Sequence, residues 1–200
     1  MPRLLKERGV YMYKILTIED TIRIPPKMFG NPLKDNVQKV LMEKYEGILD
    51  KDLGFILAIE DIDQISEGDI IYGDGAAYHD TTFNILTYEP EVHEMIEGEI
   101  VDIVEFGAFI RLGPLDGLIH ISQVMDDYVA FDPQREAIIG KETGKVLEKG
   151  DKVRARIVAV SLKEDRKRGS KIALTMRQPA LGKLEWLEDE KLETMENAEF

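Results

Sequence analysis

The feature that most constrains the fold is a run of short, alternating apolar segments divided by glycines, over residues 98–122. Its letters are GEIVDIVEFGAFIRLGPLDGLIHIS. Phe109 and Arg111 alternate there with three apolar residues, which is the period-2 pattern of a half-buried strand. Gly107 interrupts the pattern where a strand bends or bulges. We expect one long strand over 98–112, a turn over 113–117 and a return strand over 118–122.

The residues that follow continue the same all-β pattern. The segments KVRARIVAVS (152–161) and KIALTM (171–176) predict two more strands around a basic loop. A mixed connection over 123–146 separates them from the glycine-rich stretch. Strands of this size with a strong bend in the first predict a five-stranded OB-fold barrel.

The first half of the chain has a different pattern. Residues 13–24 alternate as a strand, and Pro25 and Pro26 end it because proline has no amide proton to donate. A helix is expected next, with Asn31 as N-cap, Pro32 at the first position and Gly47 beyond its end. Its expected apolar stripe is Leu33, Val37, Val40, Leu41 and Tyr45.

Further strands are expected over 47–50, 54–64, 69–72 and 81–88. Together with the helix they predict an α+β domain, with one helix on an antiparallel sheet. The predicted organisation is a disordered N-terminal extension (1–11) with no assigned function, an α+β domain (12–92), an all-β OB-fold domain (93–180) and an acidic tail (181–200). The tail either forms a short helix with Leu184, Trp186 and Leu187 partly buried, or it frays.

Charge is unevenly distributed along the chain. The net charge is −13, yet residues 145–177 hold 11 Lys and Arg against 4 Asp and Glu. One face of the second domain can therefore attract a polyanion while the rest repels it. The alternative is that KEDRKRGSK (163–171) is only a solvated hairpin loop.

The sequence predicts binding rather than catalysis. There is no cysteine, which excludes disulfides, thiol nucleophiles and thiolate-bound zinc and fits a cytoplasmic protein. His79, His93 and His120 have no metal-binding spacing, and neither a phosphate-binding nor a dinucleotide-binding glycine motif occurs. No cofactor, metal site or catalytic residue is expected. No apolar run approaches the ~18 residues of a membrane-spanning helix.

Aromatic and basic residues on the predicted barrel suggest a ligand. Phe106 and Phe109 are expected near each other on the outer surface, and Arg154 and Arg156 also alternate outward. Exposed rings stack on bases while cations meet phosphates, which suits single-stranded nucleic acid. The alternative, that both phenylalanines belong to the core, stays open at this point.

The segments GEIVDIVEFGAFIRLGPLDGLIHISQV, LEKGDKVRARIVAVS and KIALTM resemble the S1-type RNA-binding OB-fold, over about residues 95–178. In that family the surface around the two phenylalanines, the histidine and the basic strand residues contacts RNA. The resemblance implies an RNA-binding set of Phe106, Phe109, Arg111, His120, Arg154, Arg156 and Lys171. The long connection 123–146 departs from the family pattern.

The first half extends this resemblance. TIRIPPKMFGNPLKDNVQKVLMEKYEGILDKDLGFILAI and IIYGDGAAYHDTTFNILTYEPEVHEMIEGEIVDIV resemble the stalk subunits (E-prime) of archaeal RNA polymerase, counterparts of the seventh subunit of eukaryotic RNA polymerase II. This resemblance spans about residues 12–187. It implies a non-catalytic protein that forms a heterodimer with the small F subunit of the polymerase, docks on the polymerase core through its first domain, binds emerging RNA, and supports promoter opening and elongation.

Core-docking residues are expected in two turns of the first domain and before its helix. They are Phe29, Gly30, Lys51, Asp52, Gly54, Gly73, Asp74 and Gly75. Two rival functions use the same OB-fold: a free-standing RNA-binding protein, such as an exosome cap or translation factor, and an interaction module that has lost RNA binding. The absence of cysteine, and so of a zinc ribbon, argues against the exosome cap.

Overall fold

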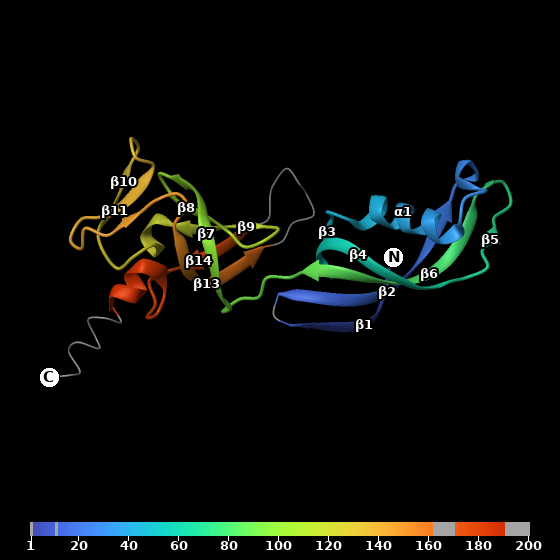
Figure 1. Cartoon of the computed structure of the whole chain (residues 1–200), viewed down its shortest axis with the longest axis horizontal. Helices are drawn as coiled ribbons and strands as arrows, with labels where there is room; N and C mark the ends of the chain where they lie inside the picture. Colours follow the sequence, from blue (N-terminus) through green and yellow to red (C-terminus); the bar gives the residue numbers. More distant parts are fainter. Residues whose placement is uncertain (1, 11, 162–170, 191–200) are drawn as a thin grey trace. The chain divides into compact units, whose positions relative to one another are not determined.

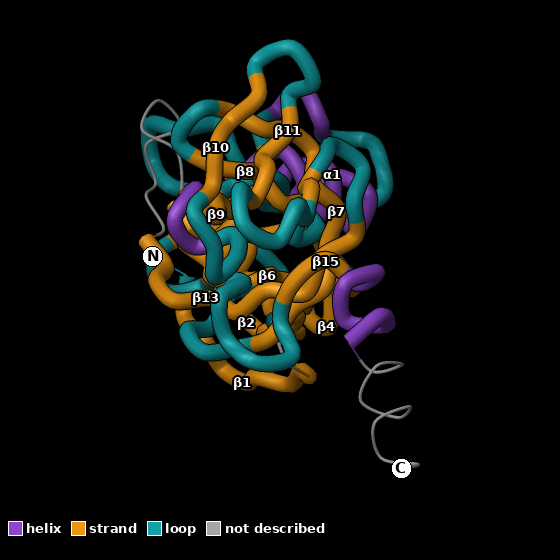
Figure 2. The backbone as a smooth tube through the Cα atoms, turned by 90° about the vertical axis from the view of Figure 1, so that its left-hand side faces the viewer, coloured by secondary structure: helices purple, strands orange, loops and turns teal. Residues whose placement is uncertain are grey.

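The computed structural model describes residues 2–10, 12–161 and 171–190, and the chain divides into two compact units with a boundary between Glu89 and Pro90. Strands form most of both units (Figure 2). This confirms the expected class, an α+β domain followed by an OB-fold barrel. None of the described helices is long and apolar enough to span a membrane.

The first unit is a strongly bent antiparallel sheet with one helix on it (Figure 1). The strands follow the order β1-β2-β6-β4-β3, and β5 pairs with β6. The elements are β1 (Arg3–Val10), β2 (Tyr13–Ile24), the 3₁₀ helix η1 (Pro26–Met28), α1 (Leu33–Tyr45), β3 (Leu49–Asp50), β4 (Gly54–Ile65), β5 (Asp69–Ile70) and β6 (Ala77–Tyr88).

The N-terminal extension differs from our expectation. Residues 3–10 form β1, which pairs with the first half of β2 from Arg3 opposite Glu19 to Val10 opposite Tyr13. Local sequence carried no clear strand signal there, because Arg3, Lys6 and Glu7 interrupt the apolar pattern. The pairing partner on β2 supplies the backbone hydrogen bonds that decide the structure.

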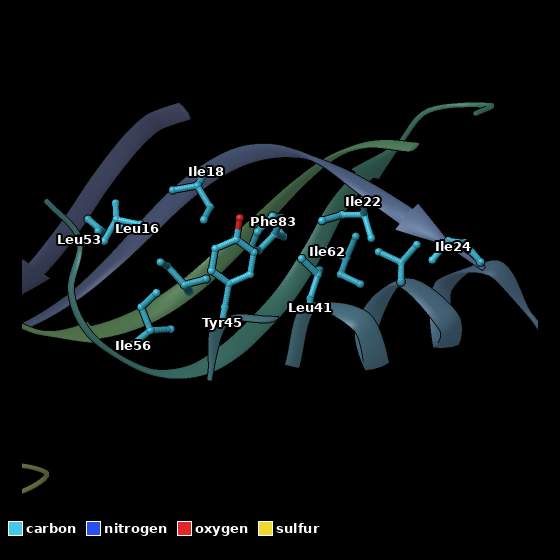
Figure 3. Close-up of a cluster of buried hydrophobic side chains, with 12 residues drawn as sticks. Leu16, Ile18, Ile22, Ile24, Leu41, Tyr45, Leu53, Ile56, Ile62 and Phe83 are labelled. Carbon is cyan, nitrogen blue, oxygen red and sulfur yellow. The ribbon is translucent and has the colours of Figure 1, made fainter. Parts of the chain in front are cut away.

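Helix α1 packs its apolar stripe on the sheet, as Figure 3 shows for Leu41 and Tyr45. Val37, Leu41 and Tyr45 are buried as expected, but Leu33 is 40% exposed. The expected N-cap is wrong: Pro32 occupies the cap position and makes no side-chain hydrogen bond. A different asparagine, Asn36, is buried and donates to the carbonyl of Met28, which ties η1 to the helix.

The second unit is a five-stranded barrel to which the connection 123–146 and the segment 182–190 are added. Its sheet order is β14-β9-β8-β7-β13-β15, and a β13–β14 pairing closes it. The elements are β7 (Met95–Val104), β8 (Gly107–Arg111), β9 (Asp116–His120), the 3₁₀ helix η2 (Ile121–Gln123), β10 (Val129–Asp132), β11 (Ala137–Gly140), β12 (Val146–Leu147), β13 (Lys152–Ser161), β14 (Lys171–Thr175) and β15 (Gly182–Lys183).

One predicted strand is two strands. The chain turns at Glu105 and Phe106, and β7 and β8 pair antiparallel, from Val104 opposite Gly107 to Glu99 opposite Arg111. Gly107 is needed because β8 and β9 lie close together, and not because a strand bends there. A Cβ on Gly107 would overlap the carbonyl oxygen of Ile119 on β9.

The connection 123–146 is ordered as a separate three-stranded sheet, β10-β11-β12. Ala137, Ile138 and Leu147 bury its inner side. Asp127 holds the turn after β11, because its carboxylate accepts hydrogen bonds from the backbone N–H groups of Glu142 and Thr143. The hydrogen bonds from Thr143, and then the one from Glu142, hold the pKa of Asp127 below its usual range.

The first part of the predicted acidic tail forms the short helix that was one of the two expectations for it. Gly182 pairs with Arg154 on β13, and residues 184–190 are helical with Leu187 buried. Residues up to 190 therefore belong to the barrel unit, because Leu181 and Leu187 have apolar side chains to bury there. The remainder of the predicted tail, 191–200, and the basic loop 163–170 lie outside the described residues.

Candidate nucleic-acid interface

The barrel brings four of the predicted RNA-binding residues onto one face. Gly107, Phe109 and Arg111 point to the same side of β8, and their ladder partners on β9 are His120, Leu118 and Asp116. Ala108 and Ile110, between them, are fully buried. Residues opposite each other share a face of the sheet, so His120 lies on the same side as Phe109 and Arg111.

Phe106 completes this face from the β7–β8 turn. Its ring centroid lies 6.2 Å from that of Phe109, and the planes are nearly perpendicular, at 85°. Phe106 is 52% exposed, whereas Phe109 is half-buried. The pair is therefore a supported aromatic edge at the surface, which decides against the core alternative for Phe106. We call Phe106, Phe109, Arg111, Leu118 and His120 the aromatic face.

Close packing of two strands makes this arrangement possible. Gly107 is opposite His120, and the backbone N–H of Ile121 donates to the carbonyl of Phe106 at 2.9 Å. A side chain at Gly107 would push β8 away from β9. Glycine at this position therefore sets the distance between the phenylalanines and the histidine.

The charges on the aromatic face are mixed. Arg111 Nε donates to Asp116 Oδ1 at 3.4 Å, and Glu99 is its ladder partner on β7. Asp102 is the ladder partner of Phe109. Both ion-pair side chains, Arg111 and Asp116, are about half exposed or more, so the pair is weak and open to exchange with a phosphate. The aromatic face therefore offers mainly rings for stacking, because its arginine, Arg111, is already paired with a carboxylate.

Two predicted arginines lie elsewhere on the barrel. Arg154 and Arg156 are on β13, which β7 separates from β8. Arg154 donates from Nε and Nη2 to Glu97 Oε1, at 2.9 and 2.7 Å. The Nε of Arg156 is buried and has no hydrogen-bond partner among the described residues. The alternating pattern correctly showed that they point outward, but in a closed barrel outward directions diverge.

Lys171 is the first residue of β14 and pairs with Ser161. Strand β14 is the neighbour of β9. The two strands run parallel, and Ala173 is opposite Leu118. Sequence reasoning missed Leu118, which is half-buried on β9 and belongs to the aromatic face. Strand β9 lies between β8 and β14. The signal was available, since Leu118 and His120 are two residues apart on one strand.

The predicted docking residues separate into two groups. Lys51, Asp52 and Gly54 belong to the β3–β4 turn, and Phe55 on β4 pairs with Tyr88 at the end of β6. Gly73, Asp74 and Gly75 precede the start of β6. Because β6 is 12 residues long and runs between them, the two turns lie at opposite ends of the sheet (Figure 1). A single docking surface would have to extend along the whole of β6 to contain both.

Gly73–Gly75 lie beside the segment that leads into α1. Arg23 makes two hydrogen bonds to Asp74, at 2.9 and 2.8 Å, and the Tyr78 hydroxyl donates to the same carboxylate at 2.6 Å. The hydrogen bonds from Arg23, and then Tyr78, hold the pKa of Asp74 below its usual range. Phe29, 50% exposed, and Gly30 follow η1 at this end.

Sequence reasoning missed the most exposed apolar group in the described chain. Ile70, Ile71 and Tyr72, directly before Gly73, are 75%, 53% and 104% exposed. The sequence predicts a strand over 69–72, but β5 ends at Ile70. Three consecutive exposed apolar residues indicate a contact surface. We call Phe29, Gly30 and residues 70–75 the tip.

The described residues contain no cluster of three or more His, Asp or Glu side chains that could hold a metal ion. His79 is buried, and its Nδ1 lies 2.9 Å from the carbonyl oxygen of Ser66, so it is part of the packed first unit. His93 lies in the segment before β7. Of the three histidines, only His120 belongs to the aromatic face.

Comparison with known proteins finds a matching family in each half of the chain. Residues 19–75 match the family described as "SHS2 domain found in N terminus of Rpb7p/Rpc25p/MJ0397", and residues 89–169 match the S1 RNA binding domain. DNA-directed RNA polymerase subunit Rpo7 of Saccharolobus shibatae is 46% identical over 180 residues, which cover 90% of this chain and 99% of that protein.

Two further relatives extend the comparison. Rpo7 of Sulfolobus acidocaldarius is 43% identical over 179 residues, covering 90% of this chain and 97% of that protein. DNA-directed RNA polymerase III subunit rpc8 of Schizosaccharomyces pombe is 26% identical over 134 residues, covering 67% and 66%. The resemblance stated from the motifs is confirmed. The chain belongs to the family of archaeal RNA polymerase subunit Rpo7, non-catalytic stalk subunits with an S1 domain.

Proposed function

We propose that this stalk subunit holds emerging single-stranded RNA on the aromatic face while the tip docks on the polymerase core. The observation that carries the RNA part is the position of Phe106, Phe109 and His120 on one face of an S1 barrel. A base stacked on an aromatic ring gains about 1–3 kcal/mol, with little dependence on sequence. That suits a transcript of arbitrary sequence.

The RNA function is tested by replacing the ring of Phe109 and, as a control, a cation that lies outside the aromatic face. Phe109→Ala should weaken binding of a labelled oligouridine by about tenfold or more, as expected for one lost stacking contact. Arg154→Gln is the matched control, because Arg154 is engaged with Glu97 on another sector of the barrel. Fluorescence anisotropy at fixed salt measures both. Equal losses in the two variants would contradict the aromatic face as the binding surface.

Support for docking comes from the tip. Ile70, Ile71 and Tyr72 expose apolar surface next to a turn that Arg23 and Tyr78 hold through Asp74. A rigid turn that presents exposed apolar side chains loses little conformational entropy when it enters a pocket on a partner. The β3–β4 turn with Lys51 and Asp52 is then not part of this contact.

Docking is tested by adding variants to purified polymerase that lacks the stalk. Ile71→Ser with Tyr72→Ser should reduce incorporation strongly, whereas Lys51→Glu at the opposite end of the sheet should not. Gel filtration of the assembled enzyme gives the bound fraction. A large loss with Lys51→Glu and none with the tip variant would move the docking surface to the other end.

We also propose the pairing with the F subunit and a role in promoter opening and elongation. Membership in the Rpo7 family supports both, together with the match of the first unit to the SHS2 domain found in the N terminus of Rpb7p and Rpc25p. The same match argues against a free-standing exosome or translation protein. Co-expression with the F subunit should give a one-to-one complex on gel filtration, and a monomer that ignores that polypeptide would contradict this pairing.

A further inference from the structure

His120 lies where β9 ends and η2 begins, and its ring is held by the residue two positions later. Nδ1 is 2.8 Å from Ser122 Oγ and accepts a hydrogen bond from the backbone N–H of Ser122 at 3.3 Å. A backbone N–H only donates, so Nδ1 is the acceptor. An imidazole nitrogen that accepts carries no proton, and in the neutral ring the proton is then on Nε2.

The turn that carries Ser122 is fixed to the segment that directly follows β14. The guanidinium of Arg177 donates from Nη1 to the carbonyl of Ser122 at 3.3 Å and forms an ion pair with Asp126. The backbone N–H of Met176 donates to the carbonyl of Gln123 at 2.8 Å. The position of Ser122 relative to His120 therefore does not depend on an RNA.

The other ring nitrogen is available. His120 is exposed, and among the described residues no group accepts a hydrogen bond from its Nε2. Its Cα packs against Gly107, and the next residue, Ile121, bonds to the carbonyl of Phe106, so His120 lies beside Phe106 on the aromatic face. A base stacked on the phenylalanines would bring its own ribose and phosphate oxygens near this nitrogen.

We propose that Ser122 is a positioning residue that holds His120 in the Nε2–H tautomer, so that the ring offers one directed donor to an oxygen of single-stranded RNA. This inference rests on the proposed RNA-binding function. The phenylalanines grip the faces of bases, which differ little between nucleotides. His120 then sets the register and direction of the strand through an acceptor oxygen of the RNA backbone.

The tautomer is measured on the full-length chain without RNA, by long-range ¹H–¹⁵N correlation NMR of the histidine rings. We expect His120 of the unmodified protein to show the Nε2–H pattern. Ser122→Ala loses the 2.8 Å contact of the hydroxyl and keeps only the longer bond from the backbone N–H, at 3.3 Å, so it should give a mixture of tautomers. Ser122→Thr, which keeps the hydroxyl, should restore one. Ser161→Ala, an exposed serine on β13, is the control and should change nothing. An Nδ1–H pattern in the unmodified protein would overturn the proposal.

Binding of labelled oligouridine then shows whether the two residues act as one. Ser122→Ala should weaken binding about three- to tenfold, the effect of one lost or misdirected hydrogen bond. In a His120→Ala background the same change should have no further effect, because coupled residues are not additive. Additive losses would overturn the proposal.

The two proposals fail in different ways. If His120→Ala binds RNA normally while Phe109→Ala does not, the RNA function stands and the role of Ser122 is wrong. If neither variant changes binding, the aromatic face is not the RNA site. Unchanged fluorescence of Trp186, the single tryptophan, shows that each variant is folded.

Discussion

At the scale of single residues, space rather than chemistry decides several positions in this protein. Gly107 is needed because β8 and β9 approach so closely that a Cβ would meet the Ile119 carbonyl. Its φ of +156° is also one that side chains rarely allow. Gly144 differs, since its φ of +67° is left-handed but nothing lies within 4 Å of the Cβ position.

Gly107→Ala should therefore destabilise the barrel unit by about 2–4 kcal/mol, from strain and overlap together. Gly144→Ala should cost only about 1 kcal/mol, from the backbone alone. Urea unfolding followed by the fluorescence of Trp186 measures both. Equal effects would mean that β8 moves away from β9 without cost.

At the scale of elements, an acid-dependent contact joins α1 to β2. The Tyr45 hydroxyl donates to Asp20 Oδ2 at 2.6 Å, and Lys44 pairs with the same oxygen. Burial acts to raise the pKa of Asp20, but the hydrogen bonds from Lys44 and Tyr45 outweigh it and the pKa is lowered. Burial, and then the bond to Asp20, raises the pKa of Tyr45. This contact fixes the last turn of the helix on the sheet.

Tyr45→Phe should lower the free energy of unfolding of the first unit by about 1–2 kcal/mol at neutral pH. Because the pKa of Asp20 is lower in the folded state, its contribution is present above about pH 4 and declines as the pH falls through the folded pKa. The difference between the unmodified protein and Asp20→Asn should therefore shrink in acid. Urea unfolding at several pH values, followed by circular dichroism, tests this. A difference that grows in acid would contradict it.

At the scale of the whole molecule, the chain consists of two units with separate cores. In the first unit Ile18, Leu41 and Phe83 meet in one cluster, and in the second Ile110 and Ile119 are fully buried in the barrel. The first unit has one sheet and the second has two, and no strand of the described residues is shared between the units. Such units are expected to unfold as separate cooperative domains.

Trp186 belongs to the second unit, whereas α1 belongs to the first. Tryptophan fluorescence should therefore follow the unfolding of the second unit in urea. Helical circular dichroism should follow mainly the first, because α1 has 13 residues and the described helix of the second unit, 184–190, has seven. Gly107→Ala should move only the fluorescence transition, and Tyr45→Phe should move mainly the other. Coincident transitions that shift together in both variants would show that the units are energetically coupled.

The sequence alone predicted much of this protein. Alternation placed Phe109 and Arg111 outside and Ala108 and Ile110 inside, and proline ended β2 at the expected residue. These features depend only on neighbours in the chain, which pattern and propensity describe. The ordered motifs also identified the family, because they recur at fixed separations.

Only the tertiary structure decided which outward residues share a surface. Arg154 points outward as predicted, but β7 separates it from Phe109, and the turns at Lys51 and Asp74 lie at opposite ends of β6. The role proposed for Ser122 depends on the turn of the chain from β9 into η2, which has His120 as its N-cap. Alternation fixes the side of a strand on which a residue lies. Strand neighbours, register and barrel closure depend on contacts between residues far apart in the chain, and these determine the sites.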